Sequence, residues 1–199
     1  EIKEIKLTVD VPGDVAPGAY FGAVRFAAVP KGATQSPDRQ VSLTASVAHL
    51  VFVEVPGDIN EQIQLESLKA QRDGKTSWLF LQAPNETALA VRNLGNGFSR
   101  PFGNVIVENM FGKETHRYEV NSTTPRGIVL PNSSRTFIDK IEGVKWPGRY
   151  TTTAAVAYGN GGEVVTFKSS FWYIPTWLLV ALLALLAALI FFGRREYKK

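Results

Sequence analysis

The chain has no cysteine, and only two histidines and one methionine among its 199 residues. The lack of cysteine excludes disulfide bridges, cysteine nucleophiles and cysteine metal ligands. Small exported animal domains usually rely on disulfides. If the chain faces outward, it is therefore expected to be a bacterial or archaeal surface protein, or to consist of domains that are stable through core packing alone.

Candidate catalytic groups are also scarce. The two histidines, His49 and His116, each lie on the apolar side of an expected strand, and neither has a partner at a spacing typical of zinc ligands. The sequence contains no nucleophile elbow, P-loop or dinucleotide-binding glycine motif. We predict that the chain is not an enzyme and that it uses no metal or cofactor.

Most of the chain has no excess of basic or acidic residues. Residues 1–173 contain 18 Lys and Arg against 17 Asp and Glu, whereas residues 194–199 contain four basic residues against one acidic residue. The sequence pI of about 9.3 is therefore partly an effect of the C-terminal tail. This distribution gives little support to a nucleic-acid partner.

A long uncharged run near the C-terminus is the dominant feature of the sequence. Residues 171–192, FWYIPTWLLVALLALLAALIFF, form a run of 22 residues without a charged side chain. A helix of this length covers roughly 33 Å, close to the ~30 Å hydrocarbon core of a bilayer. The alternative is a buried core helix, but seven leucines between Leu178 and Leu189 favour insertion by roughly 3 kcal/mol. We predict a transmembrane helix over residues 174–193.

The residues that flank this run predict its orientation. A basic segment, residues 194–199, follows it directly and is expected to be a cytoplasmic tail, with residues 1–173 outside the cell. We therefore expect a single-pass protein of the cell membrane. Because an outward N-terminus requires a signal peptide, we also expect residues upstream of Glu1. The expected membrane-interface residues are Trp172, Tyr173, Trp177, Arg194 and Arg195.

The first part of the chain, residues 1–56, shows the pattern of strands. Apolar residues alternate with polar ones from Ile5 to Val11, and further strands are expected over residues 20–29 and 41–55. Three strands cannot close a sandwich, which needs about seven. We interpret this part as the C-terminal portion of an incomplete immunoglobulin-like sandwich. It is completed either by strands upstream or by another chain.

Residues 57–173 are predicted to form a second immunoglobulin-like sandwich. Short strands are expected at regular intervals, separated by segments rich in Gly, Pro and Asn such as residues 93–97 and the hairpin turn at residues 159–162. The predicted fold class is thus all-β, with two sandwich units followed by one transmembrane helix. Three Asn-x-Ser/Thr triplets, at Asn85, Asn121 and Asn132, are interpreted as turns, although they could be modified in a eukaryotic host.

A repeated motif links the two parts. Pro17-Gly18-Ala19-Tyr20 and Pro147-Gly148-Arg149-Tyr150 each open an expected strand near the end of a unit. Pro-Gly suits a type II turn, and a tyrosine two residues later resembles the tyrosine corner of immunoglobulin-like domains, where the hydroxyl bonds backbone upstream. Tyr20 and Tyr150 are therefore predicted to be structural tyrosine corners.

Other residues are candidates for binding. Phe98, Phe102 and Phe111 lie in or beside expected loops of the second unit, as do Trp78 and Trp146, although each taken singly is more typical of a core position. In the apolar run, Ala181, Ala184 and Ala188 would permit close helix packing. Alanine is also a common filler, so an oligomer formed through the helix is left open.

The segment VPGDVAPGAYFGAVRF, residues 11–26, resembles the closing part of the first extracellular domain of the bacterial WxL-interacting surface proteins. That family has a signal peptide, two immunoglobulin-like domains, one C-terminal membrane span and a short basic tail. The layout of this chain is similar over nearly its whole length, whereas the motif covers only residues 11–26. The resemblance implies a first domain associated with the cell wall and a second associated with partner proteins.

These features predict a membrane-anchored scaffold of the cell surface, whose extracellular domains bind cell-wall polymer or another surface protein. The expected partners are the lipid bilayer and one of these two ligands. The alternative is a structural or assembly subunit of a membrane complex that acts through its helix.

Overall fold

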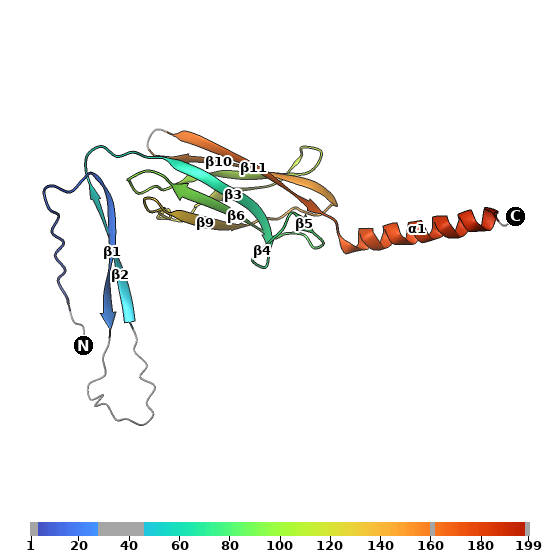
Figure 1. Ribbon diagram of the computed structural model, residues 1–199, viewed down its shortest axis with the longest axis horizontal. Coiled ribbons are helices and arrows are strands. Elements are labelled where there is room, and N and C mark those ends of the chain that lie inside the picture. The colour runs from blue at the N-terminus through green and yellow to red at the C-terminus, as the bar shows by residue number, and fades with distance from the viewer. Residues whose placement is uncertain (1–3, 28–45, 160–161, 198–199) are drawn as a thin grey trace, which may run out of the picture. The chain divides into compact units, whose positions relative to one another are not determined.

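The computed structural model describes residues 4–27, 46–159 and 162–197; within the helix, the side chains of residues 192 and 195–197 are not described. The described residues form mostly β-sheet, with one helix toward the C-terminus (Figure 1). It divides into two compact units, Glu1–Ile59 and Asn60–Lys199, which we call unit 1 and unit 2. The division falls close to the expected boundary after Pro56.

Unit 1 contains a two-stranded antiparallel sheet, β1 (Gly18–Ala27) and β2 (Ser46–Val55). Its register runs from Gly18 opposite Val55 to Ala27 opposite Ser46. The two strands agree with the expected ones where these are described; residues 28–29 and 41–45 lie outside the described ranges. The strand expected from Ile5 to Val11 is wrong, since this segment has no strand partner among the described residues. Alternation of side chains defines two faces, but a strand also needs a neighbour to pair with.

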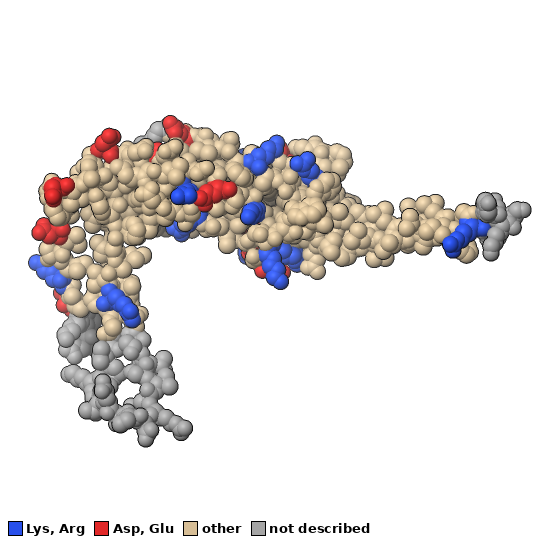
Figure 2. Space-filling view, in the orientation of Figure 1, with Lys and Arg blue, Asp and Glu red and all other residues tan. Residues whose placement is uncertain are grey.

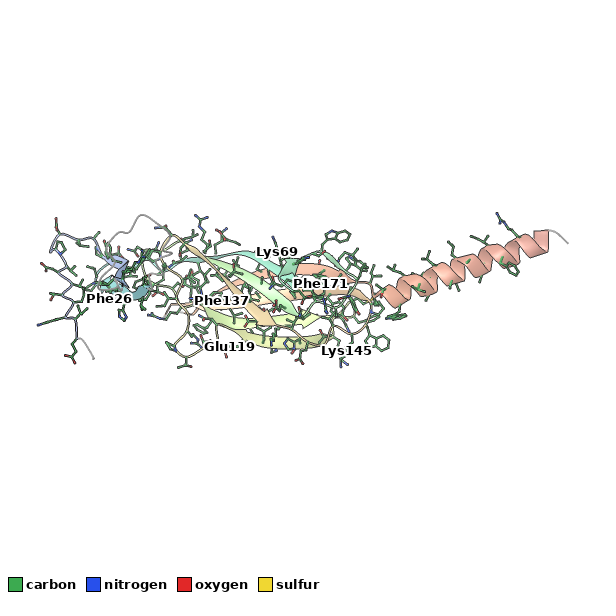
Figure 3. The ribbon with its side chains drawn as sticks, turned by 90° about the horizontal axis from the view of Figure 1, so that it is seen from below. Phe26, Lys69, Glu119, Phe137, Lys145 and Phe171 are labelled. Atoms are coloured by element: carbon green, nitrogen blue, oxygen red, sulfur yellow. The ribbon has the colours of Figure 1, made fainter. Side chains whose placement is uncertain are left out.

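Most large apolar side chains of unit 1 are exposed. They come from the segment before β1 and from both strands: Ile5, Leu7, Val9, Val11, Tyr20, Phe21, Phe26, Val47, Leu50 and Phe52. Phe26 is labelled in Figure 3. A two-stranded sheet on its own is marginally stable in water, because it has too little apolar surface to bury. Among the described residues of unit 1, these apolar side chains are therefore not gathered into a buried core.

Unit 2 consists of two sheets that share one core. The five-stranded sheet has the order β5-β11-β10-β7-β8 and the four-stranded sheet the order β4-β3-β6-β9. Among the described residues of unit 2, all strand pairings are antiparallel except that of β5 with β11. The strands are β3 (Ile63–Arg72), β4 (Lys75–Thr76), β5 (Leu79–Phe80), β6 (Glu86–Asn93), β7 (Phe102–Glu108), β8 (Glu114–Val120), β9 (Ser134–Lys140), β10 (Gly148–Tyr158) and β11 (Glu163–Tyr173).

The alternation of the sequence explains which face of each sheet is buried. Along β6, Thr87, Leu89, Val91 and Asn93 are buried, while the residues between them are more exposed. Leu89 and Val91 meet Val105 and Val156 of the other sheet in the main core cluster. Each fully buried aliphatic side chain contributes about 1.5–3 kcal/mol relative to an exposed one. The burial of both inner faces thus holds the two sheets together.

A second core cluster lies next to the end of β11, around Phe171. The ring of Phe171 stacks on that of Tyr150, with centroids 5.5 Å apart and planes 7° apart, and meets Phe80 edge-on at 5.7 Å.

The Tyr150 hydroxyl donates to the carbonyl of Trp146 at 2.8 Å, and burial raises its pKa, so it stays a donor. The Tyr20 hydroxyl likewise donates to the carbonyl of Ala16 at 2.9 Å. These are the contacts that the tyrosine-corner interpretation requires.

Asn121 and Asn132, two of the triplet asparagines, have positive φ angles, 56° and 53°. Asparagine adopts this left-handed conformation more readily than most residues because its short amide bonds to nearby backbone. The Asn121 amide is buried, donates to the carbonyls of Pro101 and Gly127, and accepts from the Gly127 amide at 2.7 Å. At Asn121 the triplet is therefore part of a folded turn.

The helix α1 (Thr176–Tyr197) begins soon after β11, with Ile174 and Pro175 between them. Pro175 is buried, and its carbonyl accepts the first amide bond of the helix, from Leu178 at 3.0 Å. A proline here costs little because its missing N–H would have no partner inside the helix. Among the described residues, no helix combines the length and the apolar character required of a membrane span.

The half-buried Asp139 of β9 predicts how the stability of unit 2 depends on pH. It lies opposite Thr87, whose hydroxyl is 2.6 Å from that of Tyr118, and burial raises the pKa of the Asp139 carboxyl. The folded state therefore holds this proton more tightly than the unfolded state does. As the pH rises through the folded-state pKa, the proton is lost and the free energy of unfolding decreases. We expect Asp139→Asn to raise the Tm at pH 7, and the difference to disappear near pH 3, where the aspartate is protonated in both states. Thermal unfolding followed by circular dichroism at both pH values is the measurement; a lower Tm of the variant at pH 7 would contradict the assignment.

Candidate functional site

The three phenylalanines expected in binding loops are not brought together. Phe98 is buried, with 9% of its surface exposed, and is therefore a core residue and not part of a binding loop. Phe102 begins β7 and is half-buried, with the Arg126 guanidinium 4.6 Å from its ring centroid. Phe111 lies beyond the other end of β7 and is 84% exposed. Only Phe111 is presented to solvent as the sequence suggests.

A concave site lies in unit 2, along the side where β3 and β11 are neighbours from different sheets. It is a groove of about 490 Å³. Its apolar wall includes Trp78, which is 71% exposed, and its polar lining comes from hydroxyl-bearing and charged side chains: Glu66, Ser67, Lys69, Thr76, Ser77 and Ser170. We call this site the β3/β11 groove. Lys69 is labelled in Figure 3.

Hydrogen bonds between the two sheets hold the floor of the groove. The Ser169 hydroxyl donates to the carbonyl of Leu68 at 2.6 Å, which joins β11 to β3. The hydroxyls of Thr152 and Ser169 lie 2.9 Å apart, which connects β10 to the same point. Since Thr152 is buried, this link is shielded from water. The groove is thus bordered by two strands whose spacing is set by side-chain bonds.

Each of the two strands beside the groove has one edge that is only partly paired. β3 pairs with β6 on one side, and on the other it pairs with β4 only at Gln71 and Arg72. β11 pairs with β10 on one side, and on the other it pairs with β5 only at Trp172 and Tyr173. Among the described residues, the remaining outer edges of both strands have no strand partner. Free strand edges can bond an elongated ligand, and an exposed indole can stack on a flat apolar surface such as a sugar face or a side chain.

Comparisons with known proteins identify no family. No known protein family and no curated protein matches the chain. Among solved structures, it is similar to the C-terminal domain of wzt, with a TM-score of 0.42 and 10% identity over 59% of this chain and 77% of that one. It is also similar to a β-glucuronidase of Parabacteroides merdae, with a TM-score of 0.34 and 17% identity over 63% of this chain and 14% of that one. A structural genomics target, SoR45, has a TM-score of 0.32 at 10% identity, over 57% and 84% of the two chains. Similarities this weak say nothing about function.

A second feature is the end of unit 2 at which β11 leads into α1; we call it the helix end. Trp172 and Tyr173, at the end of β11, pair with β5, and the Trp172 amide donates to the Trp78 carbonyl at 2.7 Å. Trp146 precedes Gly148, which lies opposite Tyr173. Trp177 stands in the first turn of α1. All four tryptophans of the chain therefore gather at the helix end, and all are exposed.

The expected interface residues are distributed along α1 and its approach. Trp172 and Trp177 are exposed, while Tyr173 is half-buried and packs against the second core cluster. Arg194 is exposed near the C-terminal end of the helix, and the Arg195 side chain lies outside the described residues. In Figure 2 the helix is uncharged along the face shown, with basic side chains near its C-terminal end.

Charged groups form no metal centre in the part of the chain that the structure describes. There, no group of three or more His, Cys, Asp or Glu side chains could hold a metal ion. The ion pairs, such as Arg117 with Glu114 at 2.7 Å, are largely exposed, so each contributes little to stability.

The sequence suggested Trp78 as a loop residue, but it contained no signal for the serines of the groove.

Proposed function

We propose that the chain is a membrane-anchored cell-surface protein whose extracellular immunoglobulin-like units bind an elongated surface polymer. The observation that carries the binding role is the β3/β11 groove, because it combines an exposed indole, several hydroxyls and two strand edges that lack a strand partner over most of their length. This combination suits a glycan, whose sugar rings have an apolar face for stacking and hydroxyls for hydrogen bonds. We take cell-wall glycan as the ligand and a surface protein as the competing one.

The anchoring role is supported by the surface of α1. Exposed large apolar side chains occupy every side of the helix: Trp177, Leu179, Val180, Leu182, Leu183, Leu185, Leu186, Leu189, Ile190 and Phe191. A helix that is apolar all round has no face suited to water, so it must be buried in protein or lipid. The uncharged run extends in the sequence through residue 192, and the basic residues that follow orient the C-terminus toward the cytoplasm.

Co-sedimentation with isolated cell-wall sacculi tests the binding role. We expect the detergent-solubilised chain to pellet saturably with sacculi, and Trp78→Ala to weaken this binding about tenfold, as loss of a stacked anchor worth roughly 1.4 kcal/mol would do. Trp146→Ala is the matched control, because Trp146 is similarly exposed but does not line the groove. Equal binding by both variants would show that the ligand does not bind in the β3/β11 groove. A lack of pelleting would favour a protein ligand.

The competing function is that of an assembly subunit that acts through its helix. The observation in its favour is that Ala181, Ala184 and Ala188 are exposed on one side of α1, where small residues permit close helix contact. Full pelleting with sacculi, sensitive to Trp78, would exclude this as the main role. Absence of any ectodomain ligand would leave the helix as the binding element.

A further inference from the structure

We propose that the helix end of unit 2 rests in the headgroup region of the bilayer, through Phe111 and Trp146 and their neighbouring lysines Lys113 and Lys145. This inference rests on the proposed anchoring of α1 and adds a second contact with lipid, made by the folded sheets. It assigns a role to exposed apolar side chains that neither the core nor the β3/β11 groove uses.

The strand registers place two loops at the helix end. Glu108, the last residue of β7, lies opposite Thr151 near the start of β10, so the turn at residues 109–113 projects from this end. Residues 142–147 lead into Gly148, which lies opposite Tyr173, the last residue of β11. Figure 3 labels Lys145 and Phe171 at the end of the sheets that adjoins the helix. Both loops therefore border the point where the chain leaves the sheets.

The two loops approach each other, so their apolar side chains lie at the same end of unit 2. A Cβ atom on Gly148 would lie 2.9 Å from the Met110 sulfur, which places Met110 directly against the segment that follows Trp146. Met110 is 58% exposed, Phe111 84% and Trp146 76%. We call this surface the apolar tip. Singly exposed apolar residues are common, but three strongly exposed ones at the same end of a domain are typical of an interaction site.

Hydrogen bonds hold the apolar tip in place. The Asn109 side-chain oxygen accepts from the amides of Phe111 and Lys113, at 3.0 and 3.1 Å, which fixes the turn that carries Phe111. The Tyr150 hydroxyl bonds both the amide and the carbonyl of Trp146, at 3.3 and 2.8 Å. Phe111 and Trp146 are thus presented on ordered backbone, so little conformational entropy is lost when the tip binds.

The short segment between β11 and α1 indicates that the apolar tip contacts lipid. From Tyr173 to Thr176 the chain can span at most roughly 11 Å, while the headgroup layer on each side of the hydrocarbon core is about 5–8 Å thick. If α1 lies in a bilayer, the helix end cannot be held far from that layer. The membrane surface therefore lies within reach of the apolar tip.

The chemistry of the tip suits a headgroup region. Trp is enriched at membrane interfaces because its ring is apolar and its N–H is polar. Lys113 and Lys145 are exposed beside Phe111 and Trp146, where their ammonium groups can approach lipid phosphates. Nearby acidic groups are Glu108, Glu114 and Glu142, and Glu114 is engaged with Arg117 at 2.7 Å. The tip therefore combines apolar insertion with attraction to anionic lipid.

Quenching of tryptophan fluorescence by brominated lipid tests the inference on the full-length chain. We would reconstitute single-tryptophan proteins into phosphatidylcholine and phosphatidylglycerol vesicles that contain 6,7-dibromo phosphatidylcholine. Trp78→Phe, Trp172→Phe and Trp177→Phe leave Trp146 as the reporter of the tip. Trp78→Phe, Trp146→Phe and Trp172→Phe leave Trp177 as the reporter of the helix. A tryptophan-free protein with Leu94→Trp is the control, because Leu94 is exposed just after β6, beyond Asn93, the opposite end of that strand from the helix end.

We expect the bromolipid to quench Trp146 at least half as strongly as Trp177, and to leave the Leu94→Trp protein unquenched. Lys113→Glu with Lys145→Glu should reduce the quenching of Trp146 at least twofold and leave that of Trp177 unchanged. Phe111→Trp in the tryptophan-free protein is a second reporter of the tip, and circular dichroism verifies that each protein folds.

The outcomes separate this inference from the proposed anchoring. If Trp177 is quenched while Trp146 and the Phe111→Trp reporter are not, α1 is in lipid but the tip is not, and the inference is overturned. If none of these reporters is quenched, the proposed anchoring is also overturned. If the Leu94→Trp control is quenched as strongly as Trp146, the contact is not specific to the helix end, which overturns the inference as well.

Discussion

Replacement of Phe171 by alanine is expected to lower the free energy of unfolding of unit 2 by about 3–5 kcal/mol, the usual cost of removing a buried aromatic ring. Phe171 is 2% exposed and lies between the rings of Tyr150 and Phe80. Its loss would leave a cavity and remove both aromatic contacts. The same two neighbours link β10 and β5 to the end of β11, so the helix end would lose its support.

Denaturant unfolding followed by circular dichroism measures this effect, with Trp172→Ala as the matched control. Trp172 is the next residue on β11 and is larger than Phe171, but its side chain is exposed. We expect the control to shift the midpoint far less than Phe171→Ala does. Similar losses in the two variants would show that the second core cluster does not carry the stability that its burial indicates.

Charge introduced into α1 is expected to release the chain from membranes. Each replacement of a leucine by arginine at the centre of a membrane helix costs about 3–4 kcal/mol of insertion free energy. Leu182 and Leu186 lie one turn apart and are both exposed on the isolated helix. Leu182→Arg with Leu186→Arg should therefore move most of the protein from the carbonate-resistant membrane fraction to the soluble or aggregated fraction.

Gly193→Arg is the control for this experiment. Gly193 is exposed, has open space around it and lies directly before Arg194, outside the apolar run. An arginine there joins the basic flank and should leave the membrane fraction unchanged. If the double variant stays in the carbonate-resistant fraction as the control does, lipid does not surround α1 at these positions, and the proposed anchoring fails.

The strands of unit 2 were predictable because their signal is local. Side chains of a strand point alternately to its two faces, so a half-buried strand such as β6 shows its alternation within eight residues. The same local pattern failed from Ile5 to Val11, where the residues alternate but no neighbouring strand is paired with them. Alternation predicts the faces of a strand, whereas the existence of a strand depends on a partner elsewhere.

The candidate site was only partly predictable. The apolar run of α1 and its basic flank are continuous in sequence, so composition alone predicted the helix and the position of Trp177. The β3/β11 groove joins residues near position 68 to residues near position 169, which no local window can relate. The burial of Phe98 was likewise not apparent from its position in an expected loop.

Residue order by itself therefore established the mostly β composition, the alternating faces of the strands, the two Pro-Gly-x-Tyr segments and the apolar C-terminal helix. These features arise from interactions between residues close in sequence. Tertiary structure decided that Ser169 bridges to Leu68, that four tryptophans share the helix end, and that Met110 packs against Gly148. The physical reason is strand register: it sets which distant residues become neighbours, and it depends on the burial of both sheets at once.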